Sequence, residues 1–207
     1  KSVLKDELIT HLKQEIIKRY GENPKDSEDY PRIINDKNLK RLKGLLENTN
    51  IVFGGDIDEK SNYMSPTLVD NPSLDDAIMQ EEIFGPILPI LTYNTEEEIN
   101  KIILNSVKPL ALYLFSKDKS FRDSIIKTYN FGGGVVNDLL VHFGNQRLPF
   151  GGIGNSGMGK NHGKHGFDTF SHEKAIMKRG TWIDPSFRYP PYEGKLSLLK
   201  KVFKYFT

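Results

Sequence analysis

The sequence predicts an α/β fold in which helices cover an open, mostly parallel sheet. Three observations predict this class: apolar runs of strand length, amphipathic patterns of helix length between them, and Gly or Pro residues where one pattern gives way to the next. Strands that are apolar along almost their whole length are typical of parallel sheets, because helices pack on both faces of such sheets.

Two helices are expected near the start of the chain. Ser2 is the candidate N-cap of the first, whose apolar residues recur every four positions as far as Ile16, and Gly21 ends it. The polar, turn-rich residues 22–31 predict a loop. The second helix follows Asn35. Its apolar face is formed by Leu39, Leu42, Leu45 and Leu46.

Apolar runs then alternate with helical patterns up to Val136. A helix opens at Thr95, which forms a capping-box pattern with Glu98, and another spans residues 121–129. This alternation is typical of strand–helix–strand units with parallel strands. The expected strands are the segments 51–53, 67–69, 87–93, 110–115 and 135–136.

Three parts are expected along the chain. Residues 1–136 form the α/β portion, residues 137–180 form a glycine-rich loop followed by an arm, and residues 181–207 form a tail. Within the arm, residues 167–176 have the mixed apolar and polar pattern of a strand. The tail is rich in proline and tyrosine at first, and then becomes basic and amphipathic.

Composition excludes several classes of function. The 207 residues contain 29 Lys and Arg, 27 Asp and Glu, and no cysteine, so no disulfide, thiolate zinc site or cysteine nucleophile lies within them. A net charge of +2 gives no indication of a nucleic-acid partner. No apolar run approaches the roughly 20 residues that span a bilayer, and residues 1–8 lack the apolar core of a signal peptide. We therefore expect a cytoplasmic location.

Two glycine patterns have the spacing of phosphate-binding loops. Residues 152–157 match G-x-G-x-x-G, but no helical pattern follows them. Residues 154–160 match the start of a P-loop, but Asn161 stands where a Ser or Thr would bind magnesium. We favour a tight structural loop whose glycines allow close packing, and a nucleotide-phosphate site stays a minor alternative.

The histidines give little indication of a metal site. His162 and His165 have a spacing that metal sites use, but no cysteine completes a ligand set. His142 and His172 have no evident partner in the sequence. We therefore interpret all four as structural or solvated histidines and predict no bound metal.

Residues 80–86, Gln-Glu-Glu-Ile-Phe-Gly-Pro, place two carboxylates and an aromatic ring just before a predicted buried strand. Ligands of α/β proteins gather in loops at strand ends. A carboxylate there can accept hydrogen bonds from ribose hydroxyl groups, and a phenylalanine can pack on a planar ring. On chemistry alone, carboxylates at a helix end and a phenylalanine in the core explain these residues equally well.

Several motifs together resemble the aldehyde dehydrogenase superfamily, in particular its class 3 and fatty-aldehyde branch. Their consistent order over nearly the whole chain makes the combination specific. The motifs are EEIFGP at 81–86, KPLALY at 108–113, GGVVND at 133–138, LPFGGIGNSGMG at 148–159, FSH at 170–172 and RYPP at 188–191.

The resemblance implies an enzyme that oxidises an aldehyde to a carboxylic acid with NAD or NADP, through attack by a cysteine thiolate. It implies that Glu82 binds the nicotinamide ribose, that Phe84 packs beside the nicotinamide, and that Asn137 orders the backbone near the site. The residues that it places in the aldehyde tunnel are Leu140, Phe143 and Phe150.

The resemblance further implies that this chain is the C-terminal portion of the enzyme. The nucleophilic cysteine, the general-base glutamate, the oxyanion asparagine and the cofactor domain would precede Lys1, so we expect no catalytic residue here and no activity of the chain alone. The alternative is a non-catalytic binding or assembly module of a degenerate relative.

The resemblance also implies a homodimer. Its oligomerisation arm would include strands near residues 135–141 and 167–178.

The tail carries four lysines and several apolar residues between Lys195 and Thr207. It is expected to pack on the protein surface rather than to attach to a membrane.

Overall fold

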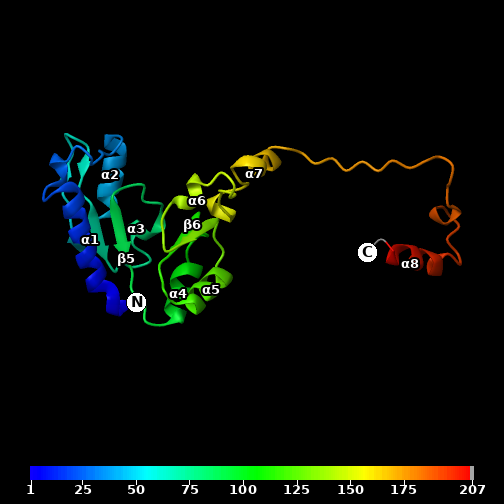
Figure 1. Cartoon of the computed structure of the whole chain (residues 1–207), viewed down its shortest axis with the longest axis horizontal. Coiled ribbons are helices and arrows are strands. Elements are labelled where there is room, and N and C mark those ends of the chain that lie inside the picture. The colour runs from blue at the N-terminus through cyan, green and yellow to red at the C-terminus, as the bar shows by residue number, and fades with distance from the viewer. Residues whose placement is uncertain (206–207) are drawn as a thin grey trace.

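The computed structural model describes residues 1–205, which form two α/β lobes and an extension (Figure 1). We call residues 1–94 the N-terminal lobe, residues 95–169 the C-terminal lobe and residues 170–205 the C-terminal extension. The extension runs away from both lobes, and its last helix lies far from them (Figure 1).

The N-terminal lobe packs helices against a small mixed sheet. Its helices are α1 (Lys5–Tyr20), α2 (Asp36–Leu45) and the short α3 (Ala77–Gln80). Its strands are β1 (Ile51–Phe53), β2 (Ile57–Asp58), β3 (Tyr63–Met64), β4 (Thr67–Asp70) and β5 (Ile87–Ile90). In the main sheet β4 lies in the middle, antiparallel to β1 and parallel to β5, while β2 and β3 form a separate antiparallel pair.

Local signals explain where the long helices of this lobe begin and end. The side chain of Asn35 accepts a hydrogen bond from the backbone N–H of Asn38 and so caps α2. Gly21, with a φ of 81°, ends α1 and donates its N–H to the carbonyl of Ile17. The core joins α2 to the strands and α3. Its buried residues are Leu39, Leu42, Leu45, Leu46, Met64, Val69, Ile78 and Ile87.

The C-terminal lobe repeats the strand–helix–strand arrangement. Its elements are α4 (Glu96–Leu104), β6 (Ala111–Leu114), α5 (Lys119–Thr128), β7 (Gly133–Val136), α6 (Val141–Gly144) and α7 (Gly163–Thr169). Strands β6 and β7 pair in parallel, and Ile99, Ile125 and Tyr129 form the buried core beneath them. At the start of α4, Thr95 accepts from the N–H of Glu98, whose carboxylate accepts from Asn94 rather than from Thr95 itself.

The predicted α/β class is confirmed, with parallel strands covered by helices in both lobes. The strands of residues 1–205 form three small sheets rather than one open sheet. After β5 the chain passes through α4 into the other lobe, so β5 and β6 do not pair. The boundaries expected at residues 136 and 180 stay a prediction.

The strand expected over residues 167–176 is wrong. Residues Gly163–Thr169 form α7, in which Lys164 and Asp168 make an ion pair at 2.6 Å with the spacing that favours a helix. The backbone from 170 to 185 then forms neither helix nor strand. The strand expected to reach residue 141 likewise ends at Val136, because Asn137 turns the chain with a φ of 58°.

The C-terminal extension contains a 3₁₀ turn at Ser186–Arg188 and the helix α8 (Leu196–Lys204). The tail was expected to pack on the surface of the protein, but α8 lies away from both lobes (Figure 1). Phe206 and Thr207 lie outside the described residues. Within residues 1–205 the structure has no helix long and apolar enough to cross a membrane.

Candidate functional site

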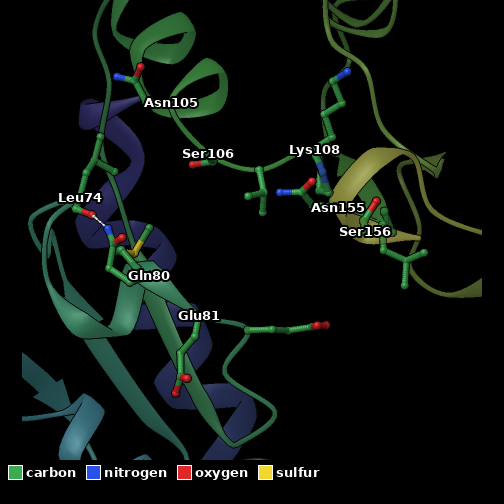
Figure 2. Close-up of a pocket in the computed structure, with 14 residues that line it drawn as sticks. Leu74, Gln80, Glu81, Asn105, Ser106, Lys108, Asn155 and Ser156 are labelled. Atoms are coloured by element: carbon green, nitrogen blue, oxygen red, sulfur yellow. Dashed lines mark hydrogen bonds between the residues drawn. The ribbon is translucent and has the colours of Figure 1, made fainter. Parts of the chain in front are cut away.

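A cavity of about 690 Å³ opens between the two lobes. One wall comes from the N-terminal lobe around α3, and it includes Gln80, Glu81 and Glu82. The opposite wall comes from the C-terminal lobe, with Lys108 before β6 and Asn155 in the glycine-rich loop. Figure 2 shows Gln80 and Glu81 on one side and Lys108 and Asn155 on the other. The cavity therefore brings together motifs that lie far apart in the sequence.

Glu82 is the only predicted cofactor-binding residue that lines this cavity. Its side chain is exposed, and no residue of the described range 1–205 forms a hydrogen bond or ion pair with its carboxylate. Such a carboxylate is free to accept hydrogen bonds from hydroxyl groups of a ligand. Lys108, Asn155 and Ser156 add donors on the facing wall, so the cavity has the polar groups that a sugar needs.

Arg41 holds the loop that carries Glu82. Its guanidinium extends from α2, donating from Nη1 to Oε1 of Glu81 over 2.7 Å and from Nη2 to the carbonyl of Ile83 over 2.6 Å. Two bonds from one planar group fix the loop in direction as well as in position. Arg41 has no motif around it in the sequence, so only the structure reveals this role.

The same loop packs tightly on the core at Gly85. A β-carbon at this position would lie 2.5 Å from Cδ2 of Leu42, whose side chain is completely buried. The loop then enters β5, where the N–H of Thr67 donates to the carbonyl of Pro86 over 2.8 Å. The loop between α3 and β5 is therefore held at both ends by the N-terminal lobe.

Phe84 lies on this loop but is not among the residues that line the cavity. Its ring is 78% exposed, and its backbone has a φ of 44°, which side chains with a β-carbon rarely adopt. Strained residues of this kind persist where the surrounding structure holds them, often at binding sites. The structure thus presents Phe84 to solvent beside Glu82 and does not bury it in the core.

The three predicted tunnel residues lie in the C-terminal lobe, away from Glu82. Phe143 on α6 contacts Phe150 edge to face, with ring centroids 5.1 Å apart. Leu140 precedes α6, is 66% exposed and has a φ of 62°. The structure brings Phe143 and Phe150 together, and Leu140 lies three residues before Phe143, at the N-cap of α6.

Two histidines, His142 and His162, pack behind this aromatic surface. His162 stacks on Phe150 with centroids 6.0 Å apart, and its Nδ1 lies 3.0 Å from the carbonyl oxygen of Leu148. His142 lies beneath Phe150 and against Tyr113, and only 7% of it is exposed. Neither ring nitrogen of His142 has a hydrogen-bond partner within residues 1–205. Both histidines therefore belong to the packing of the aromatic surface.

Asn137 orders the backbone at the end of β7. Its Oδ1 accepts a hydrogen bond from the N–H of Ser116 over 2.9 Å, and its own N–H donates to the carbonyl of Leu114 over 2.9 Å. With a φ of 58° it also turns the chain toward Leu140. Asparagine tolerates this left-handed conformation better than most residues.

Lys160, the last residue of the P-loop-like pattern, points into the protein. Its Nζ lies 2.8 Å from the carbonyl oxygen of Gly151, 3.1 Å from that of Gly152 and 3.4 Å from that of Gly132. The ammonium group thus ties the glycine-rich loop to the start of β7. Because its donors are used on these carbonyls, the structure favours the tight structural loop over a phosphate site.

Comparisons with known proteins relate this chain to one family of enzymes. Residues 1–176 match the model of the aldehyde dehydrogenase family. The chain is 50% identical, over 97% of its length, to 4,4'-diaponeurosporen-aldehyde dehydrogenase of Staphylococcus aureus. It is 40% identical, over 93% of its length, to the rat aldehyde dehydrogenase described as dimeric and NADP-preferring.

Solved structures give the same result. The substrate-bound state of Staphylococcus aureus AldH superposes with a TM-score of 0.83 at 49% identity, over 97% of this chain. The Mycobacterium tuberculosis aldehyde dehydrogenase complexed with NAD+ superposes with a TM-score of 0.65 at 28% identity, over 76% of this chain. The chain spans 44% of the length of the first of these chains and 34% of the second. It likewise spans 44% of the curated Staphylococcus aureus relative and 43% of the rat relative.

Proposed function

The chain belongs to the aldehyde dehydrogenase family, and from this membership we propose that the intact protein oxidises aldehydes to carboxylic acids with NAD or NADP. The observation that carries the proposal for this chain is the carboxylate of Glu82, which lines the cavity between the lobes and has no partner within residues 1–205. A bound nicotinamide supplies the hydride acceptor of such an oxidation. The residues described here supply the surfaces that bind and orient it.

Glu82 is the proposed ligand of the nicotinamide ribose. Its carboxylate accepts hydrogen bonds from two neighbouring hydroxyl groups, an arrangement that fixes both the position and the rotation of the sugar. Arg41 keeps the loop in place through Glu81 and Ile83, so Glu82 itself stays free for the ligand. Phe84, two residues further along the loop, is proposed to pack its exposed ring against the planar nicotinamide.

Leu140, Phe143 and Phe150 are proposed to line the path of the aldehyde. Their side chains offer an apolar surface, backed by His142 and His162. An apolar wall favours aldehydes with hydrocarbon substituents, because transfer of such groups from water is favourable. We therefore propose apolar aldehydes as the substrate class.

This chain contributes binding surfaces but no nucleophile, because it contains no cysteine. The thiolate that adds to the aldehyde carbonyl, and the base that activates water to release the acid, belong to other residues of the intact protein. We propose that the 207-residue chain alone has no dehydrogenase activity. Robust NADH formation from an aldehyde by the purified chain would contradict this.

We further propose that the intact protein is a homodimer. We propose the cytoplasm as its location, where dinucleotide cofactors are available. The C-terminal extension supports the dimer, since it leaves both lobes (Figure 1) and its large apolar side chains are exposed. Within it, Phe170 is 91% exposed, Ile176 70% and Met177 95%. Extended segments of this kind are buried when they pack against a partner.

Glu82→Gln in the intact protein tests the cofactor assignment. The substitution keeps the shape of the side chain but removes its charge, so we expect KM for the dinucleotide to rise about 10-fold or more. Glu22→Gln is the matched control, because Glu22 is exposed and lies outside the cavity. An unchanged KM in Glu82→Gln would remove Glu82 from the cofactor site.

The non-catalytic alternative has a distinct outcome. If the intact protein carrying this chain binds NAD and NADP but oxidises no aldehyde from a panel of alkyl and aryl aldehydes, the degenerate binding module is the correct interpretation. Activity with any of them, lost on removal of this chain, supports the enzyme.

A further inference from the structure

A small hollow of about 200 Å³ lies in the C-terminal extension, in the segment that precedes helix α8. Residues of the extension alone line it: Arg179, Gly180, Trp182, Ile183, Pro185 and Arg188. Arg188 also opens the RYPP motif at 188–191, which neither the fold nor the proposed function uses. The hollow shares no lining residue with the cavity between the lobes, so it is a separate candidate site.

The charge of Arg179 is matched within the extension. Its Nη1 donates to Oδ1 of Asp184 over 3.1 Å, and the hydroxyl of Tyr189 donates to the same oxygen over 3.1 Å. The hydrogen bond from Arg179, and after it the one from Tyr189, lowers the pKa of the Asp184 carboxyl from its ordinary value. Asp184 is therefore ionised at neutral pH and balances the charge of Arg179.

Arg188 has no such partner. Within residues 1–205 its guanidinium forms no hydrogen bond or ion pair, although its charge acts on the Asp184 carboxylate through space. The turn that carries Arg188 is ordered, because Nζ of Lys195 lies 3.0 Å from the carbonyl oxygens of both Ser186 and Tyr189. The hollow thus contains one guanidinium whose donors have no partner within the described residues.

The rest of the hollow is apolar. The indole of Trp182 lies against Gly180, where a β-carbon would collide with Nε1 of the ring. Trp182 is nevertheless 83% exposed, and Ile183 is 51% exposed. An exposed aromatic ring that shares a hollow with a guanidinium can cover the hydrocarbon part of a ligand while the guanidinium binds its charge.

From this geometry we propose that the hollow binds a monocarboxylate with an apolar body. The planar fork of Arg188 matches the two oxygens of a carboxylate, and Trp182 and Ile183 cover the hydrocarbon part. Charge complementarity favours a carboxylate over a phosphate ester. Because Asp184 already balances Arg179, one positive charge of the hollow is unmatched, and it complements one negative charge better than two.

The site stands on the residues of the extension and does not depend on dehydrogenase activity. Carboxylic acids with apolar substituents are also the class of product that the proposed function would form. The side chains named above for the dimer, Phe170, Ile176 and Met177, precede the hollow in the sequence and do not line it. Dimer contacts through those side chains therefore leave Arg188 and Trp182 to a ligand.

Titration of the 207-residue chain with sodium hexanoate tests the proposal. Trp182 is the single tryptophan of the chain, so its fluorescence reports on the hollow. We expect a saturable change in emission with a Kd of about 1 mM, and weaker binding at high salt. Hexanol lacks the charge and inorganic phosphate lacks the apolar body, so each should bind more weakly by about 10-fold or more.

Two variants of Arg188 separate its charge from its shape. Arg188→Gln should weaken hexanoate binding by about 10-fold or more, and Arg188→Lys, which keeps the charge but loses the fork, should weaken it several-fold. Arg147→Gln is the matched control, because Arg147 is exposed and lies outside the hollow. The control should bind hexanoate like the unaltered chain. Thermal unfolding should be the same in all of these proteins, because neither arginine side chain forms a hydrogen bond or ion pair within residues 1–205.

Three outcomes would overturn the proposal. The first is no saturable change of the Trp182 emission with hexanoate. The second is binding of hexanol or phosphate as tight as that of hexanoate, which would contradict the proposed class of ligand. The third is hexanoate binding that Arg188→Gln weakens no more than Arg147→Gln does, which would remove Arg188 from the site.

Discussion

Arg41 on α2 and Glu81 after α3 are joined by a hydrogen-bonded ion pair, with Nη1 of the arginine 2.7 Å from Oε1 of the glutamate. Nη2 of the same guanidinium reaches the carbonyl of Ile83 over 2.6 Å. The neighbouring Glu82 is left without a partner within residues 1–205 and lines the cavity between the lobes. The two adjacent glutamates thus differ in role. Glu81 is held by Arg41, whereas Glu82 is available to a ligand in the cavity.

Arg41→Lys should loosen this loop, because an ammonium group cannot reproduce the two parallel bonds of a guanidinium. The pair is half exposed, so we expect the free energy of unfolding of the 207-residue chain to fall by only about 1 kcal/mol. In the intact protein we expect a rise of several-fold in KM for the dinucleotide. Urea unfolding and steady-state kinetics measure the two effects, and an unchanged KM would contradict the role of Arg41 in the site.

Gly85→Ala should destabilise the N-terminal lobe. The new β-carbon would lie 2.5 Å from the Cδ2 atom of Leu42, whose side chain is completely buried. Overpacking of this kind costs about 1–3 kcal/mol. Gly44→Ala in α2 is the control, since a β-carbon there meets nothing within 4 Å and should stabilise the helix by about 0.5 kcal/mol or more. Thermal unfolding of both variants shows whether the two effects have opposite signs.

His142→Phe and His162→Phe should differ in stability although the chemical change is the same. Both variants keep an aromatic ring against Phe150. His142 loses nitrogens that have no partner within residues 1–205, whereas His162 loses the bond to the carbonyl of Leu148. We expect His162→Phe to be less stable by about 1 kcal/mol, and the φ of 78° at His162 acts in the same direction. Equal losses in urea unfolding would indicate a hydrogen-bond partner for His142.

Asp58 should contribute to stability in acid. The ammonium of Lys25, 2.9 Å from Oδ2, together with donors from Ser61 and Lys60, lowers the pKa of its carboxyl group to about 2. Since the folded pKa lies below the ordinary value, the stabilisation is present above about pH 4 and is lost as the pH falls toward 2.

Asp58→Asn should therefore lower the free energy of unfolding at neutral pH, and its disadvantage should shrink between about pH 4 and pH 2. Urea unfolding at several pH values measures this. Asp29→Asn serves as a comparison, because Asp29 is exposed and forms no ion pair among the described residues. A constant difference between Asp58→Asn and the unaltered chain across this range would be inconsistent with the ion pair.

The helices that the sequence predicted correctly depend on signals within a few residues. Asn35 caps α2 and Asp118 caps α5 with their own side chains, and apolar residues repeat along each helix. In the glycine-rich region the secondary structure was not predicted correctly. The strand predicted over residues 167–176 begins within helix α7, which ends at Thr169. This helix is held partly by the hydroxyl of Thr169, which bonds to the backbone N–H and carbonyl of Lys160 nine residues earlier.

The family and the α/β class could be predicted from the sequence by itself. Both depend on the order of the motifs and on apolar periodicity, which are properties of the sequence alone. The tertiary structure alone decided that Glu81 is paired while Glu82 has no partner within residues 1–205, and that Lys160 points inward to backbone carbonyls. It also decided that α8 leaves the surface on which the tail was expected to pack (Figure 1). These results depend on which distant atoms meet: Arg41 and Glu81 are 40 residues apart, and no local pattern records that contact.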